Sequence, residues 1–117
     1  MKKVLVVDDD PDILYLVKYV LKNAGFDVCT YSTGLGVTEQ VAACSPDVIL
    51  LDIMLPGRMG TEVCKDLRKA FSIPIIFFSA HANKDQVLRE CKAYGFIPKP
   101  FNIKDMVSTI SECAYHD

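Results

Sequence analysis

Four short apolar runs of this chain are each followed by a polar or charged side chain. These side chains are Asp8 and Asp9 after Val4–Val7, Asp52 after Val48–Leu51, Ser79 after Ile73–Phe78, and Lys99 after Phe96–Ile97. Each of them alone is explained as well by a turn, a helix cap or a solvated surface. Together they indicate a shared site, because the same placement recurs along the chain.

The residue types at these positions suit phosphoryl transfer to a carboxylate. Gathered carboxylates repel one another unless a cation offsets their charge. Oxygen ligands suit a hard ion, so Asp8, Asp9 and Asp52 form a candidate site for Mg²⁺ (or Mn²⁺), with a backbone carbonyl after Asp52 able to complete it. A lysine would balance charge on the transferring group, and a serine hydroxyl would bond an incoming oxygen. We therefore expect the chemistry at Asp52.

The apolar runs have the composition of strands that are buried on both faces of a parallel sheet. Val48–Leu51 is uninterrupted and is followed by Asp52 and the Pro56-Gly57 pair. Phe26–Tyr31 is a weaker strand candidate, and Phe96–Ile97 is a short one. The carboxyl ends of parallel strands meet at one edge, where open α/β sheets bind ligands, so the polar residues above can meet there.

Helical patterns separate the predicted strands. Asp10 is the expected N-cap and Pro11 the first residue of a helix that stops at Gly25. Further helices are expected over Thr33–Cys44, Gly60–Ala70 and Asn83–Ala93, and after the cap residue Asn102. The alternation predicts five βα units in a single α/β domain over residues 1–117, with helices on both sides of one parallel sheet and no output domain in the chain.

Length and composition exclude several classes of protein. The chain has 117 residues, 50% of them hydrophobic and 24% charged, and a formal net charge of −2. Its basic residues do not cluster beyond pairs, which argues against nucleic-acid binding. No apolar run approaches the ~20 residues of a membrane span. The five cysteines are odd in number and form no C-x-x-C pair, so we expect them reduced and the protein cytoplasmic.

Four motifs resemble the receiver domain of bacterial two-component response regulators. They are Val6-Val7-Asp8-Asp9-Asp10, Leu51-Asp52-Ile53-Met54-Leu55-Pro56-Gly57 with Gly60, Phe78-Ser79-Ala80, and Lys99-Pro100-Phe101. They occur in the order and spacing of that family, and the resemblance covers the whole chain. It implies a flavodoxin-like fold, a doubly wound (βα)5 parallel sheet with strand order 2-1-3-4-5.

The resemblance also implies a function and roles for individual residues. Asp52 would accept a phosphoryl group from a histidine kinase or histidine phosphotransfer protein. Asp9, Asp52 and the Met54 carbonyl would bind Mg²⁺ directly, and Asp8 largely through water. Lys99 would contact the phosphoryl group, across a Lys99–Pro100 bond that is usually cis in the family.

Switching and partners follow from the same resemblance. Ser79 and Phe96 would act as switch residues that change the face made by the fourth helix, fifth strand and fifth helix, which a downstream effector would bind. Such a module is a monomer or a weak phosphorylation-dependent dimer. It catalyses only its own phosphorylation and slow dephosphorylation, so we do not expect an enzyme.

Four positions depart from the family pattern. Met59 stands where Asp or Asn is common, with Arg58 before it, and Phe96 lacks the hydroxyl of the commoner Tyr. Lys92 occupies a position where Gly is frequent. His81, two residues after Ser79, lies where family members tune dephosphorylation, so we hypothesise that it sets the lifetime of the phosphorylated state, although an exposed loop histidine fits equally.

Three other functions fit parts of the sequence. A haloacid-dehalogenase-like phosphatase would use Asp8 as nucleophile and Asp10 as acid/base, but Pro11 makes Asp10 a helix cap, and no late acidic motif or cap insertion is present. A flavodoxin-like cofactor carrier would need a glycine- and hydroxyl-rich first loop rather than an acidic one. A degenerate receiver would act by binding only, although the residues needed for phosphorylation are present.

Overall fold

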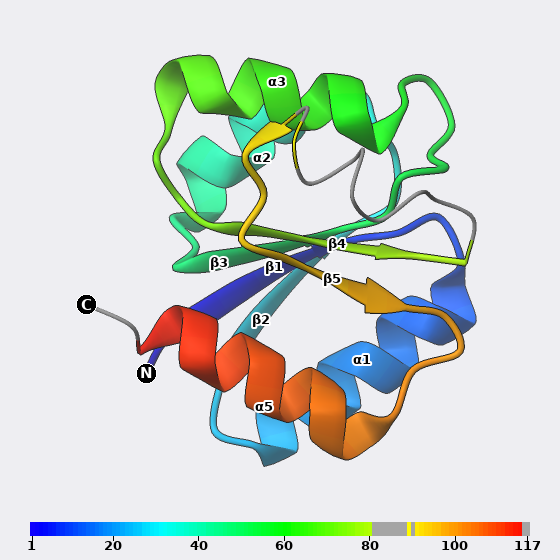
Figure 1. The fold of residues 1–117 in the computed structure, drawn as a ribbon, viewed down its shortest axis with the longest axis vertical. Helices are drawn as coiled ribbons and strands as arrows, with labels where there is room; N and C mark the ends of the chain where they lie inside the picture. The colour runs from blue at the N-terminus through cyan, green and yellow to red at the C-terminus, as the bar shows by residue number, and fades with distance from the viewer. Residues whose placement is uncertain (81–88, 90, 116–117) are drawn as a thin grey trace.

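The fold is a five-stranded parallel sheet covered by helices on both faces (Figure 1). The computed structural model describes residues 1–80, 89 and 91–115. Its elements are β1 (Lys3–Val7), α1 (Pro11–Asn23), β2 (Asp27–Tyr31), α2 (Val37–Cys44), β3 (Val48–Leu51), α3 (Gly60–Ala70), β4 (Ile75–Ser79), β5 (Gly95–Pro98) and α5 (Ile103–Ala114). The strand order is β2-β1-β3-β4-β5, which confirms the predicted doubly wound α/β fold.

The two faces of the sheet bury alternate residues of each strand, as a pleated strand requires. Leu5, Ile49 and Phe77 pack with α2 and α3 on one face, whereas Val6, Leu50 and Phe78 pack with α1 and α5 on the other. Strands β1, β3 and β4 are therefore apolar at nearly every position, because neither of their faces meets solvent. This explains why their unbroken apolar runs predicted central strands.

Helix α1 begins and ends where its sequence predicts. The Asp10 carboxylate accepts hydrogen bonds from the amides of Asp12 (2.9 Å) and Ile13 (3.4 Å), and Pro11 is the first helical residue. Gly25 follows the helix with a φ of +97°, a conformation that glycine adopts without steric cost. Asn102 caps α5 in the same way, through the amide of Asp105.

Several predicted boundaries differ from the structure. Strand β4 begins at Ile75 rather than Ile73 and includes Ser79, and β1 and β2 each begin one residue away from the predicted start. Helix α2 begins at Val37 rather than Thr33, because Gly36 precedes it in a left-handed conformation (φ +75°) that a helix cannot include. Strand β5 extends one residue beyond each end of Phe96–Ile97. Most of the helix predicted over Asn83–Ala93, with its capping residues and His81, lies outside the described residues.

The prediction that all five cysteines are reduced is wrong for four of them. The structure pairs Cys29 with Cys44 and Cys64 with Cys91 as disulfides, with Cα atoms 6.7 Å and 6.0 Å apart. Cys113 is a buried free thiol whose pKa is raised to about 11 by burial. The cysteines therefore give no support to a reducing compartment. In the described part of the chain no helix is long and apolar enough to span a membrane.

Candidate functional site

The sheet places the site residues by extending its hydrogen bonding one peptide beyond the strands. The amide of Asp52 donates to the carbonyl of Val7 (2.9 Å), and the amide of Asp8 donates to Tyr31 (3.1 Å). The amide of Lys99 donates to the carbonyl of Ser79 (3.1 Å). Each of these backbones is thereby fixed next to the neighbouring strand at the carboxyl edge of the sheet.

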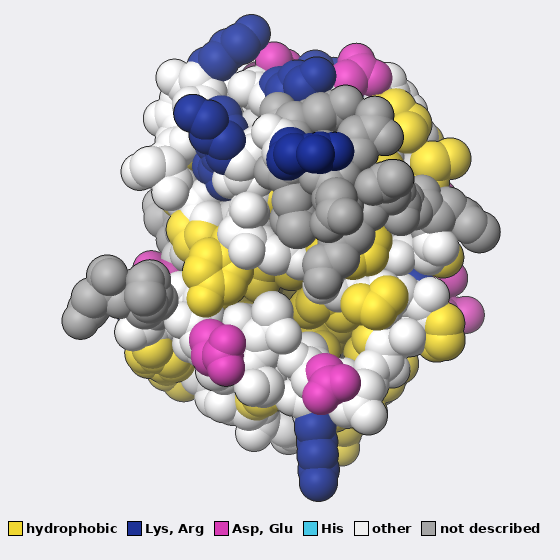
Figure 2. Space-filling view, in the orientation of Figure 1, with side chains coloured by type: hydrophobic (Ala, Val, Ile, Leu, Met, Phe, Trp, Pro, Cys, Tyr) yellow, Lys and Arg dark blue, Asp and Glu magenta, His cyan; other side chains and the backbone are white. Residues whose placement is uncertain are grey.

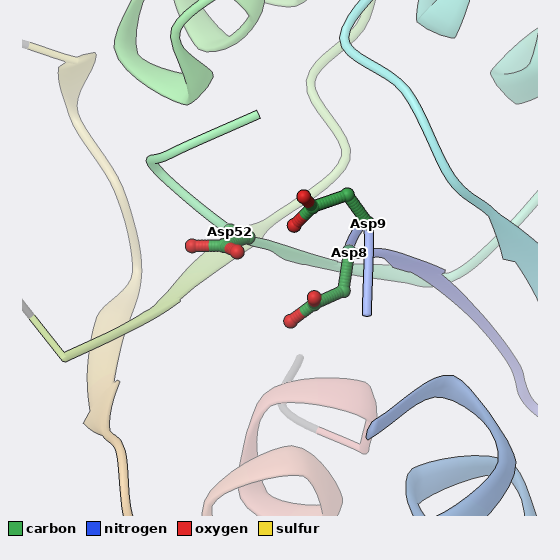
Figure 3. Close-up of side chains that lie close together, drawn as sticks. All are labelled: Asp8, Asp9 and Asp52. Atoms are coloured by element: carbon green, nitrogen blue, oxygen red, sulfur yellow. The ribbon is translucent and has the colours of Figure 1, made fainter. Parts of the chain in front are cut away.

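Three carboxylates meet at this edge (Figure 3). Asp8 and Asp9 follow β1 and Asp52 follows β3, and one carboxylate oxygen from each lies within 4.8 Å of the others. Asp8 is fully buried and Asp52 is 5% exposed, whereas Asp9 is exposed. The site thus has a buried floor of two carboxylates and one carboxylate open to solvent.

Lys99 joins the two buried carboxylates. Its Nζ lies 2.6 Å from Asp8 Oδ2 and 3.2 Å from Asp52 Oδ2, so one ammonium group bonds both. The same Nζ lies 4.7 Å from the centre of the Phe78 ring. This cation–π contact was not predicted, because an apolar run indicates a buried strand but not which of its side chains a distant lysine reaches. This confirms that residues 8, 52 and 99 come together.

Burial and charge act in opposite directions on these groups. Burial raises the pKa of the Asp52 carboxyl, and the Lys99 charge only partly reverses this, while Asp8 adds to the rise. For Lys99, burial acts to lower the pKa, but the hydrogen bond to Asp8 and the charges of Asp52 and Asp8 outweigh it, so its pKa is raised. Burial therefore disfavours the charged form of Asp52, and the contact with Lys99 favours it.

These side chains line one hollow of about 370 Å³ at the carboxyl edge. Its walls are Asp8, Asp9, Asp10, Asp52, Met54, Ser79, Ala80 and Lys99. The amide of Met54 donates to Asp52 Oδ1 (3.2 Å), which orients the carboxylate from its other oxygen. Of the predicted site residues that the structure describes, all except Phe96 thus line one hollow, and Asp10 and Ala80 are additional members. The predicted site residue His81 lies outside the described residues.

Gly60 supports the site from behind. A Cβ atom at this position would overlap the carbonyl oxygen of Asp52 and approach the Ile53 Cα to 2.8 Å. Its amide also donates to the carbonyl of Ile53 (2.7 Å). The first turn of α3 can therefore pack directly against the peptide of the central carboxylate only because residue 60 has no side chain.

The predicted switch residue Phe96 lies away from the hollow. It pairs with Phe77 across β4 and β5, and it is half-buried against the core on the α2–α3 face. Ser79 is buried and pairs with Pro98 in the same ladder. The two residues are therefore linked by adjacent strands rather than by the hollow itself.

The structure describes two of the residues that depart from the family pattern, Arg58 and Met59, in the loop before α3. The Arg58 guanidinium forms an ion pair with Asp66 on α3, and this hydrogen bond lowers the pKa of the Asp66 carboxyl. Met59 occupies the N-cap position of α3, where it makes no side-chain capping bond. Arg58 thus ties the loop after Asp52 to α3 at a point where a capping Asp or Asn is absent.

The acidic cluster has the composition of a divalent-cation site. Three carboxylate oxygens are within mutual reach, and among the described residues no nitrogen or sulfur ligand joins them, which suits Mg²⁺ or Mn²⁺. Asp10 does not serve as a second acid/base group beside Asp8, because its carboxylate caps α1. The geometry therefore gives no support to the phosphatase alternative.

The peptide bond between Lys99 and Pro100 is cis, as the family resemblance implied. This bond lies directly after the lysine that contacts both buried carboxylates.

Comparisons with known proteins agree with this description. Residues 4–111 match the family model described as "Response regulator receiver domain". The BeF3-activated N-terminal receiver domain of Klebsiella pneumoniae RstA is 28% identical, with a TM-score of 0.92 over 98% of this chain and 100% of that one. The chemotaxis protein CheY4 of Vibrio cholerae is 29% identical, with a TM-score of 0.88 over 97% of this chain and 98% of that one. The receiver domain of the Francisella response regulator 1452 is 28% identical, with a TM-score of 0.90 over 97% of each chain.

Proposed function

Because the chain belongs to the response regulator receiver domain family of two-component systems, we propose that it is a phosphoacceptor signalling module in which Asp52 is phosphorylated. The phosphodonor would be a histidine kinase or a histidine phosphotransfer protein. The observation that carries the proposal is the position of Lys99 Nζ, which contacts Asp52 and Asp8 together at an open hollow. Asp8 shares the burial and the lysine partner, but its side chain is 1% exposed against 6% for Asp52, so Asp52 is the more accessible of the two carboxylates.

The transfer is a displacement at phosphorus. An oxygen of the Asp52 carboxylate forms the new P–O bond while the P–N bond of the donor phosphohistidine breaks, and the imidazole keeps the bonding electron pair and takes a proton from solvent. The Met54 amide holds Oδ1 of the nucleophile, and Lys99 holds Oδ2.

Asp8, Asp9 and Asp52 would hold a Mg²⁺ (or Mn²⁺) ion, with the backbone carbonyl of Met54 as a further ligand. Such an ion neutralises charge on a transferring phosphoryl group. Lys99 would supply the remaining positive charge beside the phosphoryl oxygens. Ser79, which lines the same hollow, would donate its hydroxyl to one of them.

We propose that the signal leaves the site through β4 and β5. Ser79 moving toward a phosphoryl oxygen would alter its pairing with Pro98, and Phe96 lies two residues along the same strand. The change would reach the face of the fourth helix, β5 and α5, where a downstream effector would bind. We propose that the protein turns over no metabolite and acts as a switch rather than as an enzyme. It would act in the cytoplasm, as a monomer or a weak phosphorylation-dependent dimer.

The test is the intact mass after incubation with acetyl phosphate, with and without Mg²⁺. Wild type should gain one phosphoryl group that depends on Mg²⁺ and is removed by hydroxylamine, and Asp52→Asn should gain none. Asp27→Asn is the matched control, because Asp27 is exposed at the opposite edge of the sheet, at the start of β2. If no phosphoryl group is gained under any condition, the remaining interpretation is a degenerate receiver that acts by binding only. A gain that survives in Asp52→Asn but not in Asp8→Asn would support the phosphatase.

A further inference from the structure

A cluster of cations lies at the opposite edge of the sheet from the phosphorylation site. The basic patch consists of Lys65 and Arg68 on α3 and Lys92 just before β5. Arg68 and Lys92 line two adjoining hollows of about 330 Å³ and 200 Å³, and Lys65 lines the second. In Figure 2, Lys and Arg side chains gather on the part of the surface that overlies α3.

Arg68 is the fixed member of the basic patch. Its Nη1 donates to the carbonyls of Ile73 (2.8 Å) and Phe71 (3.4 Å), which anchors the guanidinium over the end of α3. Burial lowers the pKa of this guanidinium, and no carboxylate among the described residues pairs with it. Its Nη2 and Nε groups therefore remain able to donate to an external anion.

Asp66, the acidic residue of α3 nearest in sequence to Lys65 and Arg68, already forms ion pairs with other residues. Asp66 pairs with Arg58 and with Lys69, neither of which lines the two hollows. Among the described residues, Lys65 and Lys92 likewise form no ion pair, and both are exposed. The positive charge of the basic patch is therefore not neutralised within the described part of the chain.

The backbone of Lys92 points to a use for its side chain. Its φ is +54°, in the left-handed region that favours glycine and disfavours other residues. A glycine here would leave the turn before β5 unstrained, yet the position carries a lysine that lines both hollows. The strain is consistent with a side chain that is retained for binding.

We propose that the basic patch binds an acidic segment of a partner protein, independently of phosphorylation at Asp52. A protein segment fits better than a small metabolite, because two of the three cations are exposed and the hollows adjoin along the surface rather than enclosing a ligand. Exposed charges of this kind steer and orient a partner. The three cations of the basic patch would attract an acidic segment to this face, and the acidic cluster would repel it from the carboxyl edge.

The experiment measures binding of a fluorescein-labelled hexaglutamate peptide to the unphosphorylated protein by fluorescence anisotropy, at about 0.05 M salt to limit screening. The double variant Lys65→Glu/Lys92→Glu should bind at least about tenfold more weakly, as expected when contacting charges are reversed together. Lys104→Glu is the matched control, because Lys104 is an exposed cation on α5, away from the hollows. It should bind as wild type does.

A second variant separates a binding role from a structural one. Lys92→Gly should raise the thermal unfolding midpoint, because it relieves the left-handed backbone, and should at the same time lower the affinity for the peptide several-fold. A raised midpoint with unchanged affinity would overturn the proposal. So would equal weakening by Lys104→Glu, or inorganic pyrophosphate binding at the same residues more tightly than the peptide, which would indicate a small-anion site.

Discussion

Replacing Lys99 with methionine tests whether one ammonium group neutralises the buried floor of the site. At an effective dielectric constant of ~20, charges 2.6 Å and 3.2 Å apart attract by about 6 and about 5 kcal/mol. Most of this is offset by the cost of removing Lys99 and the two carboxylates from water. Removing one partner of a buried ion pair nevertheless costs 3–5 kcal/mol in general, and the 19% exposure of the Lys99 side chain favours the lower end.

We therefore expect Lys99→Met to lower the free energy of unfolding by about 3 kcal/mol in the presence of EDTA. With a urea m-value of about 2 kcal/mol/M, the midpoint should fall by roughly 1.5 M. Added Mg²⁺ should stabilise this variant more than it stabilises wild type, because the ion no longer competes with Lys99 for Asp8 and Asp52. The gap between the two proteins closes by the difference in their binding free energies, so a tenfold higher affinity of the variant for Mg²⁺ would close it by about 1.4 kcal/mol at saturation.

The assay is urea unfolding followed by circular dichroism, in EDTA and in saturating Mg²⁺. Lys104→Met controls for the loss of an exposed lysine. It should change the unfolding free energy by less than about 0.5 kcal/mol, as substitutions at the surface usually do. A loss of under about 1 kcal/mol for Lys99→Met would mean that its contacts behave as surface ion pairs, and would refute the buried-floor argument. A gap that Mg²⁺ leaves unchanged would refute a cation site at these carboxylates.

Three further predictions concern other positions. Asp9→Asn should stabilise the protein slightly in EDTA, because it removes an exposed charge that repels Asp8 and Asp52, and should reduce the stabilisation by Mg²⁺ in the same urea assay. Gly60→Ala should lower the free energy of unfolding by about 3 kcal/mol because its methyl group meets the Asp52 peptide, whereas Gly95→Ala, with open space at its Cβ, should not. Denatured without reductant, the chain should show one thiol by Ellman titration, that of Cys113, and five after reduction; five before reduction would contradict both disulfides.

The sheet and the buried site were predictable because both depend on one regular feature. Strands with no solvent-facing side are apolar throughout, so each stands out in the sequence, and the first polar residue after it falls at the carboxyl edge. Asp8, Asp52 and Lys99 could therefore be grouped without knowledge of their distances. The weaker strand β5 was predicted too short because Gly95 is half-buried and Pro98 exposed, so neither extends the apolar pattern.

Pairwise contacts between side chains were not predictable in the same way. Arg58 reaches Asp66 across eight positions, and Cys64 reaches Cys91 across 27, and no periodicity relates the members of either pair. The odd number of cysteines favoured reduced thiols, but the count is consistent with two disulfides and one free thiol as well. Such contacts depend on the position and direction of α3 on the sheet. The sequence pattern indicates only which face of α3 is buried.

The placement of the two proposed sites at opposite edges of the sheet follows from the same parallel topology. The carboxyl edge presents peptides that continue the ladder, so the backbones of Asp52 and Lys99 are held by hydrogen bonds to neighbouring strands. The opposite edge is made by the C-terminal end of α3 and by the turn that enters β5, where Lys92 already adopts an unfavourable backbone. Strand β5 connects them, because Lys92 precedes it and Lys99 follows it. The two proposed sites therefore lie at the two ends of β5, and helix α3 also spans them, because Gly60 packs against the Asp52 peptide and Arg68 lies near the other end of the helix.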